Sequence, residues 1–227
     1  MRVFQPHLFP SERNTILCGA KNHVSDSLEV RVSQPHLFFG LSPPPGHGGF
    51  DPGKVGVNQS LEKDINLAIS KKLSEILASN GYTVYMTRTE DVALCQGDER
   101  SKKLADMKNR VAMIEEKAPS LVVSIHQNSF SAGTKGAQVF YHTKSVEGKR
   151  LAGILQQSVR EAVGDDNHRV EKANDSYYML RKVSCPLVIV ECGFLSNPKE
   201  EALLQDEKYQ KKMAQGIAEG IENFLYK

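Results

Sequence analysis

Residues 121–129 read LVVSIHQNS, and this stretch decides the class of fold. The run is almost continuously apolar as far as Ile125, which is typical of a strand buried on both faces of a parallel sheet. It then becomes polar, beginning with His126. A second run, PLVIVECGF at 186–194, has the same apolar character and carries Glu191. Two such strands predict a sheet that helices cover on both faces.

The segments around these two runs alternate between strand and helix patterns. Residues rich in β-branched and aromatic side chains predict further strands over 82–88 and 137–142. Helical spacing predicts four helices, whose apolar positions span 61–77, 104–114, 151–162 and 209–224. Ser60 is placed to cap the first of these helices. We therefore expect a single α/β domain with a central, mostly parallel twisted sheet and helices on both faces.

The first forty residues differ from the rest of the chain. RVFQPHLFP at 2–10 nearly repeats as RVSQPHLFF at 31–39, and neither copy has a clear hydrophobic period. We expect residues 1–40 to be an atypical leader, weakly structured or mis-started, in front of a main domain over 41–227. A change of reading frame or a wrong start upstream of Pro45 would account for this leader. An uninterrupted genomic frame, with the same leader in related chains, would contradict that hypothesis.

Composition excludes several classes of function. The net charge is only +2 with 25% charged residues, so we expect no nucleic-acid partner. No apolar run approaches the roughly 20 residues of a membrane-spanning helix, and the N-terminus has no visible signal peptide. The four cysteines form no CxxC pair, which argues against a zinc knuckle or a thioredoxin-type motif. We expect a monomer with no membrane span.

Four polar residues stand where a parallel sheet places its chemistry, beyond the carboxyl ends of its strands. LSPPPGHGGFDPGKVG at 41–56 is a tight glycine- and proline-rich loop that carries His47, and Glu62 lies in the first turn of the next helix. His126 and Glu191 belong to the two buried strands. Two imidazoles and one carboxylate are the protein ligands of a catalytic zinc with an open fourth position. A second carboxylate is then able to act as general base, and the absence of HExxH excludes an ordinary zincin.

Each of these residues also has a purely structural interpretation. The two histidines could belong only to a loop and a strand end, and Glu62 could simply favour the helix dipole. A carboxylate within VIVEC is costly to bury without a partner, so Glu191 could form an ion pair with Arg181 or Arg88. The metal site is the interpretation that uses all four residues together.

Five ordered motifs between about 45 and 225 resemble one family of bacterial enzymes, the zinc-dependent N-acetylmuramoyl-L-alanine amidases of type 3. The motifs are GHGGFDPGKVG at 46–56, LEKDINLAISKKL at 61–73, YTVYMTR at 82–88 with the later Asp91, NRVAMIEEKAPSLVVSIHQNS at 109–129, and PLVIVECGFLSNPKE at 186–200. Any one of them alone would be weak, but their number and order make the resemblance specific.

The resemblance implies both a site and a reaction. The family's zinc ligands fall on His47, Glu62 and His126, and its catalytic glutamate falls on Glu191. The implied cofactor is Zn²⁺, and residues 41–227 are the implied catalytic domain. The implied reaction is hydrolysis of the amide between the lactyl group of N-acetylmuramic acid and L-alanine in peptidoglycan. Weaker candidates for contacts with this substrate are Asn128, Arg181 and Ser196.

The wording ECGFLSNP at 191–198 is most similar to germination-specific members, which act on the spore cortex. That likeness implies an extracytoplasmic, cell-wall or cortex location, with an accessory protein left open as a further partner. One departure is Pro44, which replaces the aspartate that usually precedes the Pro-Gly-His-Gly-Gly segment and would weaken zinc binding if that aspartate orients a ligand. The alternatives are a catalytically weak wall-binding or regulatory protein on an amidase scaffold, and another zinc hydrolase such as a peptidase.

Overall fold

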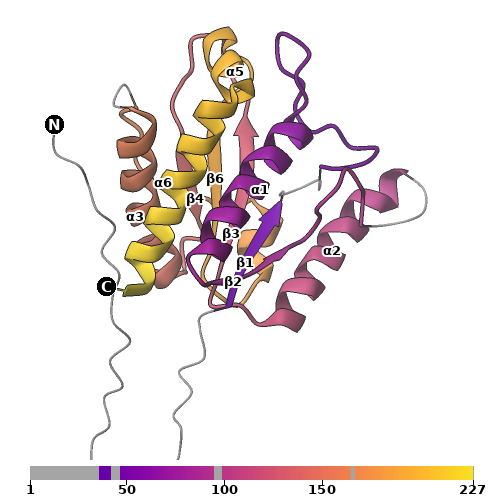
Figure 1. The fold of residues 1–227 in the computed structure, drawn as a ribbon. Coiled ribbons are helices and arrows are strands. Elements are labelled where there is room, and N and C mark those ends of the chain that lie inside the picture. Colours follow the sequence, from indigo (N-terminus) through magenta and orange to yellow (C-terminus); the bar gives the residue numbers. More distant parts are fainter. Residues whose placement is uncertain (1–35, 42–46, 95–98, 165–166, 227) are drawn as a thin grey trace, which may run out of the picture. The chain divides into compact units, whose positions relative to one another are not determined.

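The fold is built on a mixed sheet. The computed structural model describes residues 36–41, 47–94, 99–164 and 167–226, all within the second of two compact units, which spans 34–227. Among these residues the strands are β1 (His36–Leu41), β2 (Thr83–Met86), β3 (Leu121–Asn128), β4 (Gln138–Tyr141), β5 (Lys172–Ala173) and β6 (Leu187–Phe194). Their order across the sheet is β2-β1-β3-β6-β4-β5 (Figure 1). The first four strands in this order are parallel to one another, and β4 is antiparallel to β6.

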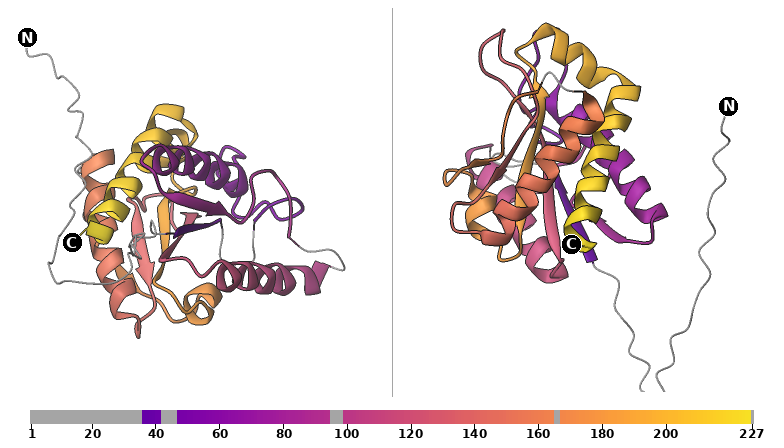
Figure 2. Two further views of the ribbon diagram at one scale, coloured as in Figure 1. Left: turned by 60° about the horizontal axis from the view of Figure 1, so that its bottom comes forward. Right: turned by 90° about the vertical axis from the view of Figure 1, so that its left-hand side faces the viewer.

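Helices cover both faces of the sheet, as the sequence predicted. The helices are α1 (Glu62–Ser79), α2 (Glu99–Lys117), α3 (Val146–Val163), α4 (Tyr178–Lys182), α5 (Pro198–Gln205) and α6 (Glu207–Tyr226). The long helices α1, α3 and α6 lie on one face, and α2 and α4 lie on the other (Figure 2). The side chains of β3 alternate between the two faces of the sheet. Val123 and Ile125 belong to the core on the side of α1, α3 and α6, and Val122 belongs to the core on the side of α2 and α4. None of the described helices combines the length and the apolar character that crossing a membrane requires.

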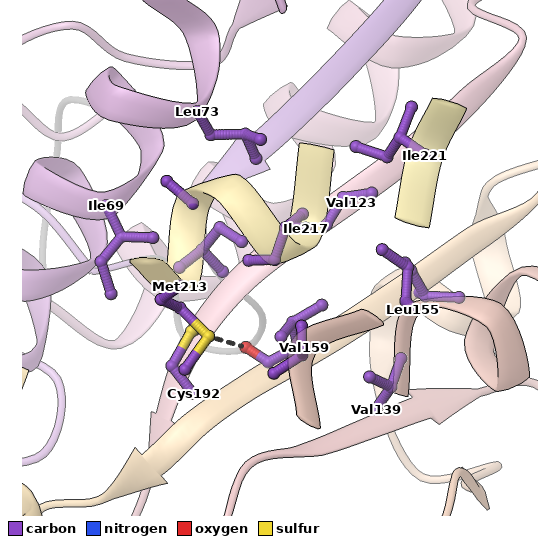
Figure 3. Packing of buried hydrophobic residues seen from close by; sticks show 14 of the residues in the cluster. Ile69, Leu73, Val123, Val139, Leu155, Val159, Cys192, Met213, Ile217 and Ile221 are labelled. Carbon is purple, nitrogen blue, oxygen red and sulfur yellow. Dashed lines mark hydrogen bonds between the residues drawn. The ribbon is translucent and has the colours of Figure 1, made fainter. Parts of the chain in front are cut away.

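The larger core lies where α6 packs between α1 and α3. Ile217 of α6 is 0% exposed and lies among Ile69, Leu155 and Val159 (Figure 3). Gly216 allows α6 to approach α3 closely, because a Cβ there would lie 2.6 Å from the Cβ of Ala162. The C-terminal helix therefore completes the core, as its apolar spacing predicted.

The structure changes the boundary that the sequence predicted for the leader. Residues 36–40 belong to β1, which pairs with β2 on one side and with β3 on the other. The residues HLFFGL do not alternate between apolar and polar side chains, so the sequence shows no strand period here. The chain becomes a strand because two neighbouring strands satisfy its backbone groups. The remainder of the predicted leader, residues 1–35 of 1–40, and the departure at Pro44 lie outside the described residues.

Two smaller predictions also need revision. The first helix begins at Glu62, and its N-cap is Leu61, which makes no side-chain cap, so the predicted cap by Ser60 is wrong. The short elements β5, α4 and α5 had no counterpart among the elements predicted from the sequence. They are too short to carry a reliable hydrophobic period.

Candidate metal centre and active site

The predicted site residues meet at one edge of the sheet. Strands β1, β3 and β6 are parallel, so their carboxyl ends lie at the same edge. His126 lies near the end of β3, and Glu191 is its register partner in β6. Glu62 is in the first turn of α1, and His47 lies on the loop between β1 and α1. The sequence prediction that these four residues converge agrees with this placement.

His47, Glu62 and His126 form one buried cluster. Glu62 lies between the two imidazoles, with Oε2 at 3.1 Å from His47 Nε2 and Oε1 at 2.8 Å from His126 Nδ1. One ligand atom from each of the three residues lies within 4.8 Å of the other two. The three side chains come from a loop, a helix and a strand, so only the folded chain brings them together.

The carboxylate of Glu62 is ionised and held by several donors. Lys54 N donates to Oε2 at 2.8 Å, and Gln127 N donates to Oε1 at 3.2 Å. Burial alone would raise the pKa of Glu62, but its hydrogen bonds with His126 and His47 outweigh burial and hold the pKa far below the usual range. Glu62 therefore offers a negative charge to a cation bound by the two imidazoles.

His47 owes its position to the glycine-rich loop. Gly53 has φ of 73°, and a Cβ there would lie 2.7 Å from His47 Cγ and 2.8 Å from Glu62 Cβ, so the bare backbone is what lets the loop close over the cluster. Asp51 Oδ1 lies 3.4 Å from His47 Nδ1. Burial lowers the pKa of His47, but the contacts with Asp51 and Glu62 outweigh it and raise the pKa to about 9.

The pKa of His126 is shifted in the opposite direction. Burial is the main influence and lowers its pKa to about 4, although Glu62 acts in the other direction. Its Nε2 lies 3.2 Å from Ser124 Oγ. His126 is thus a neutral imidazole at physiological pH, which is the form that binds metal ions.

Glu191 is buried on the same edge but remains outside the three-residue cluster. Burial raises its pKa to about 8, and the charge of Glu62 adds to this effect. Tyr177 OH donates to its Oε1 at 3.4 Å, whereas its Oε2 has no hydrogen-bond partner among the described residues. The alternative of an ion pair with Arg88 is not what the fold shows, because that side chain donates to the carbonyls of Lys63 and Glu90.

The weaker candidates for substrate contacts make local hydrogen bonds or lie at the surface. Asn128 Oδ1 accepts from Ser129 N at 2.8 Å and thus shapes the end of β3. Ser196 Oγ accepts from Phe130 N at 2.9 Å, so it ties two loops together. Arg181 is exposed on α4. Cys192 is a fully buried thiol in the larger core, and its Sγ contacts the Val190 carbonyl (Figure 3).

Sequence reasoning missed two residues that support the site. Asp51 lies in the motif GHGGFD, four residues after His47, and its side chain contacts that imidazole. A carboxylate so close in sequence to a candidate ligand was a signal that it could orient the imidazole. Tyr177 reaches Glu191 from a loop that precedes α4, and nothing in the sequence links the two residues. The first had a signal in the sequence, and the second had none.

The donor set of the cluster fits a single metal ion. Two imidazoles and a carboxylate are a usual zinc donor set, and Zn²⁺ binds such atoms at about 2.0–2.2 Å. Ligands of a tetrahedral ion are then about 3.4 Å apart. One ligand atom from each of the three residues lies within 4.8 Å of the others, so shifts of the side chains would bring them to this spacing. Asp51 beside His47 is the kind of carboxylate that orients a metal-binding imidazole.

The α/β sheet carries a buried His–Glu–His cluster at its carboxyl edge, and a further buried carboxylate lies next to it. This arrangement is that of a hydrolase with a candidate metal centre. The chain belongs to the N-acetylmuramoyl-L-alanine amidase family, whose profile matches residues 44–223. The predicted amidase class is therefore confirmed, and peptidoglycan is the substrate that this class acts on.

Individual relatives agree with this assignment. The chain is 35% identical over 185 residues to the germination-specific N-acetylmuramoyl-L-alanine amidase of Bacillus subtilis (strain 168), covering 80% of this chain and 77% of that protein. It is similar in structure to the CwlD amidase of Clostridioides difficile, solved in complex with the GerS lipoprotein, with a TM-score of 0.80, 38% identity and coverage of 85% and 98%. The catalytic domain of CwlV from Bacillus (Paenibacillus) polymyxa has a TM-score of 0.71, 32% identity and coverage of 84% and 98%.

Proposed function

We propose that this amidase is zinc-dependent and that it cleaves the amide between the lactyl group of N-acetylmuramic acid and L-alanine in spore-cortex peptidoglycan. The observation that carries the proposal is the buried cluster of His47, Glu62 and His126, with Glu191 beside it in the register of β3 and β6. The cluster has the donor set of a catalytic zinc site, and Glu191 has the position of a general base.

His47, Glu62 and His126 would hold the ion. Zn²⁺, when bound there, supplies a Lewis acid that polarises the amide carbonyl and lowers the pKa of water. Glu191 takes the proton of the attacking water and delivers it to the departing amine of alanine, so that the C–N bond breaks and a carboxylate and a free amine result. The hydrogen bond from Tyr177 to Oε1 orients Glu191 and leaves Oε2 available for the proton.

The cortex assignment is supported by likeness to particular relatives. One of them is named a germination-specific amidase, and the CwlD amidase has the highest TM-score of the structures compared above. Cortex peptidoglycan lies outside the cytoplasm, so the proposal includes an extracytoplasmic place of action. The chain itself is proposed to act as a monomer towards its substrate.

An accessory protein is a second part of the proposal. The CwlD amidase was solved in complex with a lipoprotein, and this chain covers 98% of that amidase at 38% identity. We therefore expect a partner in the same compartment to bind this chain. Co-purification of the chain from sporulating cells of its source, followed by mass spectrometry, tests for such a partner.

The reaction is tested on purified peptidoglycan fragments. The chain is incubated with muropeptides and added Zn²⁺, and products are identified by mass spectrometry. We expect new peptides with free alanine amino termini and glycans with a free lactyl carboxylate. Glu191→Gln serves as the matched inactive control. Intact cortex and vegetative peptidoglycan are compared as substrates, and we expect faster release from cortex.

Three results would contradict parts of the proposal. Cleavage inside the peptide, with the lactyl amide intact, would make the chain a peptidase. Binding to the wall without cleavage at saturating zinc would support the alternative of a weakly catalytic wall-binding protein. Equal release from both walls would remove the cortex assignment and leave the amidase activity standing.

A further inference from the structure

Glu201 on α5 has a buried carboxylate, and both of its oxygens accept hydrogen bonds from the short loop 58–60. Its side chain is 0% exposed. Oε1 accepts from Ser60 Oγ at 2.6 Å, and Oε2 accepts from Asn58 N at 2.8 Å and from Asn58 Nδ2 at 2.9 Å. Ser60 N adds a longer contact to Oε1 at 3.3 Å. Burial alone would raise the pKa of Glu201, but these hydrogen bonds outweigh it and lower the pKa. The group is therefore an ionised anchor for residues 58–60.

The anchored loop leads directly into the metal cluster. Ser60 is two residues before Glu62. Within the loop, Gly56 N donates to Ser60 O at 2.8 Å, and Glu62 N donates to Lys54 O at 3.0 Å. Lys54 N in turn donates to the Glu62 carboxylate at 2.8 Å. The loop is thus closed on itself, and one of its own amides holds the oxygen of Glu62 that faces His47.

The helix that carries Glu62 has no cap of its own. The N-cap residue Leu61 makes no side-chain hydrogen bond to α1. Ser60, which the sequence suggested as the cap, points its hydroxyl to Glu201 instead. The preceding residue, Gln59, has φ of 67°, a conformation that a side chain rarely adopts without outside support. These observations indicate that the start of α1 takes its position from α5.

Gly56 shows how closely the anchor fits. A Cβ at this position would overlap Oε1 of Glu201 and Oγ of Ser60. The loop therefore admits the Glu201 carboxylate only because residue 56 has no side chain. Helix α5 lies at the same end of the sheet as the first turn of α1, although 139 residues, 62 to 201, separate the two glutamates in the sequence (Figure 1).

We propose that Glu201 is a positioning residue of the metal site: through Asn58 and Ser60 it fixes the loop that holds the Glu62 carboxylate in place for the ion. The inference rests on the proposed function, since it concerns the affinity for Zn²⁺. Glu201 touches neither substrate nor metal in this scheme. Its role is to lower the freedom of Glu62 before the ion binds.

The first test replaces the carboxylate by an amide. In the full chain, Glu201→Gln turns one acceptor into a donor that faces the donors of Asn58 or Ser60. We expect the Kd for Zn²⁺, measured by competition with a chromophoric chelator, to rise by about tenfold. We expect amide hydrogen exchange over 56–62 in the metal-free protein to accelerate. Activity should approach the wild-type value again as Zn²⁺ is raised, which loss of a catalytic group would not allow.

A second variant and a matched control separate positioning from folding. Gly56→Ala keeps Glu201 but forces its carboxylate away from the loop, so it should weaken Zn²⁺ binding in the same way. Glu200→Gln is the control, because this neighbour on α5 accepts from Gly136 N at 2.7 Å and from Phe194 N at 2.8 Å. It loses comparable hydrogen bonds without loosening residues 56–60, and its Kd for Zn²⁺ should remain that of the wild type.

The outcomes are distinguishable. Wild-type Zn²⁺ affinity and unchanged exchange over 56–62 in both Glu201→Gln and Gly56→Ala would overturn the inference. Weakening by Glu200→Gln to the same extent would also overturn it, because the effect would then belong to α5 as a whole. A wild-type chain that binds no Zn²⁺ would defeat the proposed function itself, and the inference with it. If Glu201→Gln does not fold, Gly56→Ala and the exchange measurement still decide.

Discussion

His126 and Glu191 are register partners in the parallel strands β3 and β6, although 65 residues, 126 to 191, separate them in the sequence. Partners in a parallel ladder present their side chains on the same face of the sheet. The pairing therefore places a neutral imidazole of the metal cluster beside a buried carboxylate that is outside that cluster. This arrangement keeps the candidate ligand and the candidate base apart but adjacent, and it leads to the first prediction.

Glu191→Gln should abolish catalysis while Zn²⁺ still binds. The amide keeps the size of the side chain and can accept from Tyr177, but it cannot take a proton. Loss of a general base typically costs about 10²–10⁴-fold in rate, so kcat should fall by this amount. Release of alanine amino termini measures kcat, and chelator competition measures zinc binding. A variant that keeps more than about a tenth of wild-type kcat would exclude Glu191 as the base.

Zinc affinity should rise with pH in the physiological range. The pKa of His47 is about 9 in the metal-free protein, so its imidazole must lose a proton before it binds the ion. His126, with its pKa lowered to about 4, is already neutral. The apparent affinity should therefore increase by at least about tenfold per pH unit between about pH 6 and 8. Calorimetry in buffers of different ionisation enthalpy counts the protons released.

Glu191→Gln is a useful comparison for this pH dependence. The pKa of Glu191 is raised to about 8, so the wild type is able to release a second proton when the positive ion binds nearby. In the variant only the His47 proton remains, and the slope should approach one proton per ion. Affinity that does not change between these pH values would show that His47 is neutral or that it is not a ligand.

The pKa of Glu191 also predicts the stability of the metal-free protein. The folded state keeps this proton up to about pH 8, whereas the unfolded carboxyl ionises near its ordinary value of 4.5. Between these values the folded state binds more protons, so stability falls as pH rises. The upper limit of the effect is about 5 kcal/mol. Glu191→Gln should remove it, raising the Tm of the metal-free protein more at pH 8 than at pH 5. An equal Tm difference at both pH values would contradict the buried, protonated state.

Asp51→Asn should weaken zinc binding without removing a ligand. Asp51 Oδ1 lies 3.4 Å from His47 Nδ1, where a carboxylate orients the imidazole and makes it more basic. Such changes usually cost about 10–100-fold in metal affinity. The control is Asp175→Asn. That exposed carboxylate accepts hydrogen bonds from Thr143 and lies 3.5 Å from His142, and none of these contacts involves the metal cluster. If both variants bind Zn²⁺ as the wild type does, Asp51 has no part in holding the ion.

Ile217→Ala should destabilise the fold strongly. The side chain is 0% exposed and lies between α1, α3 and the sheet (Figure 3). Truncation of such a residue leaves a cavity and typically costs about 2–5 kcal/mol. The free energy of unfolding from urea denaturation measures the loss. Leu203→Ala is the comparison, because that side chain is 47% exposed and should cost about 0.5 kcal/mol or less. Similar losses in both would place α6 outside the cooperative core.

The sequence alone predicted the long elements and the convergence of four polar residues at one edge of the sheet. The continuous apolar runs of β3 and β6 are strong signals because both faces of these strands are buried. The helical spacing of α1, α3 and α6 is a strong signal because each of these helices buries one face over many residues. His47, Glu62, His126 and Glu191 could be chosen because parallel strands bring their carboxyl ends together. The motif resemblance then supplied the reaction class, which the family assignment confirms.

Only the tertiary structure decided how these parts are held. Residues 36–41 form a central strand because β2 and β3 flank them, and their own short sequence has no period that shows this. Tyr177 reaches Glu191, and Glu201 reaches Ser60, through hydrogen bonds between segments that the sequence treats as unrelated. A local pattern records which face of an element is buried. It contains no information about which distant donor will satisfy a buried carboxylate, because packing of the whole chain determines that choice.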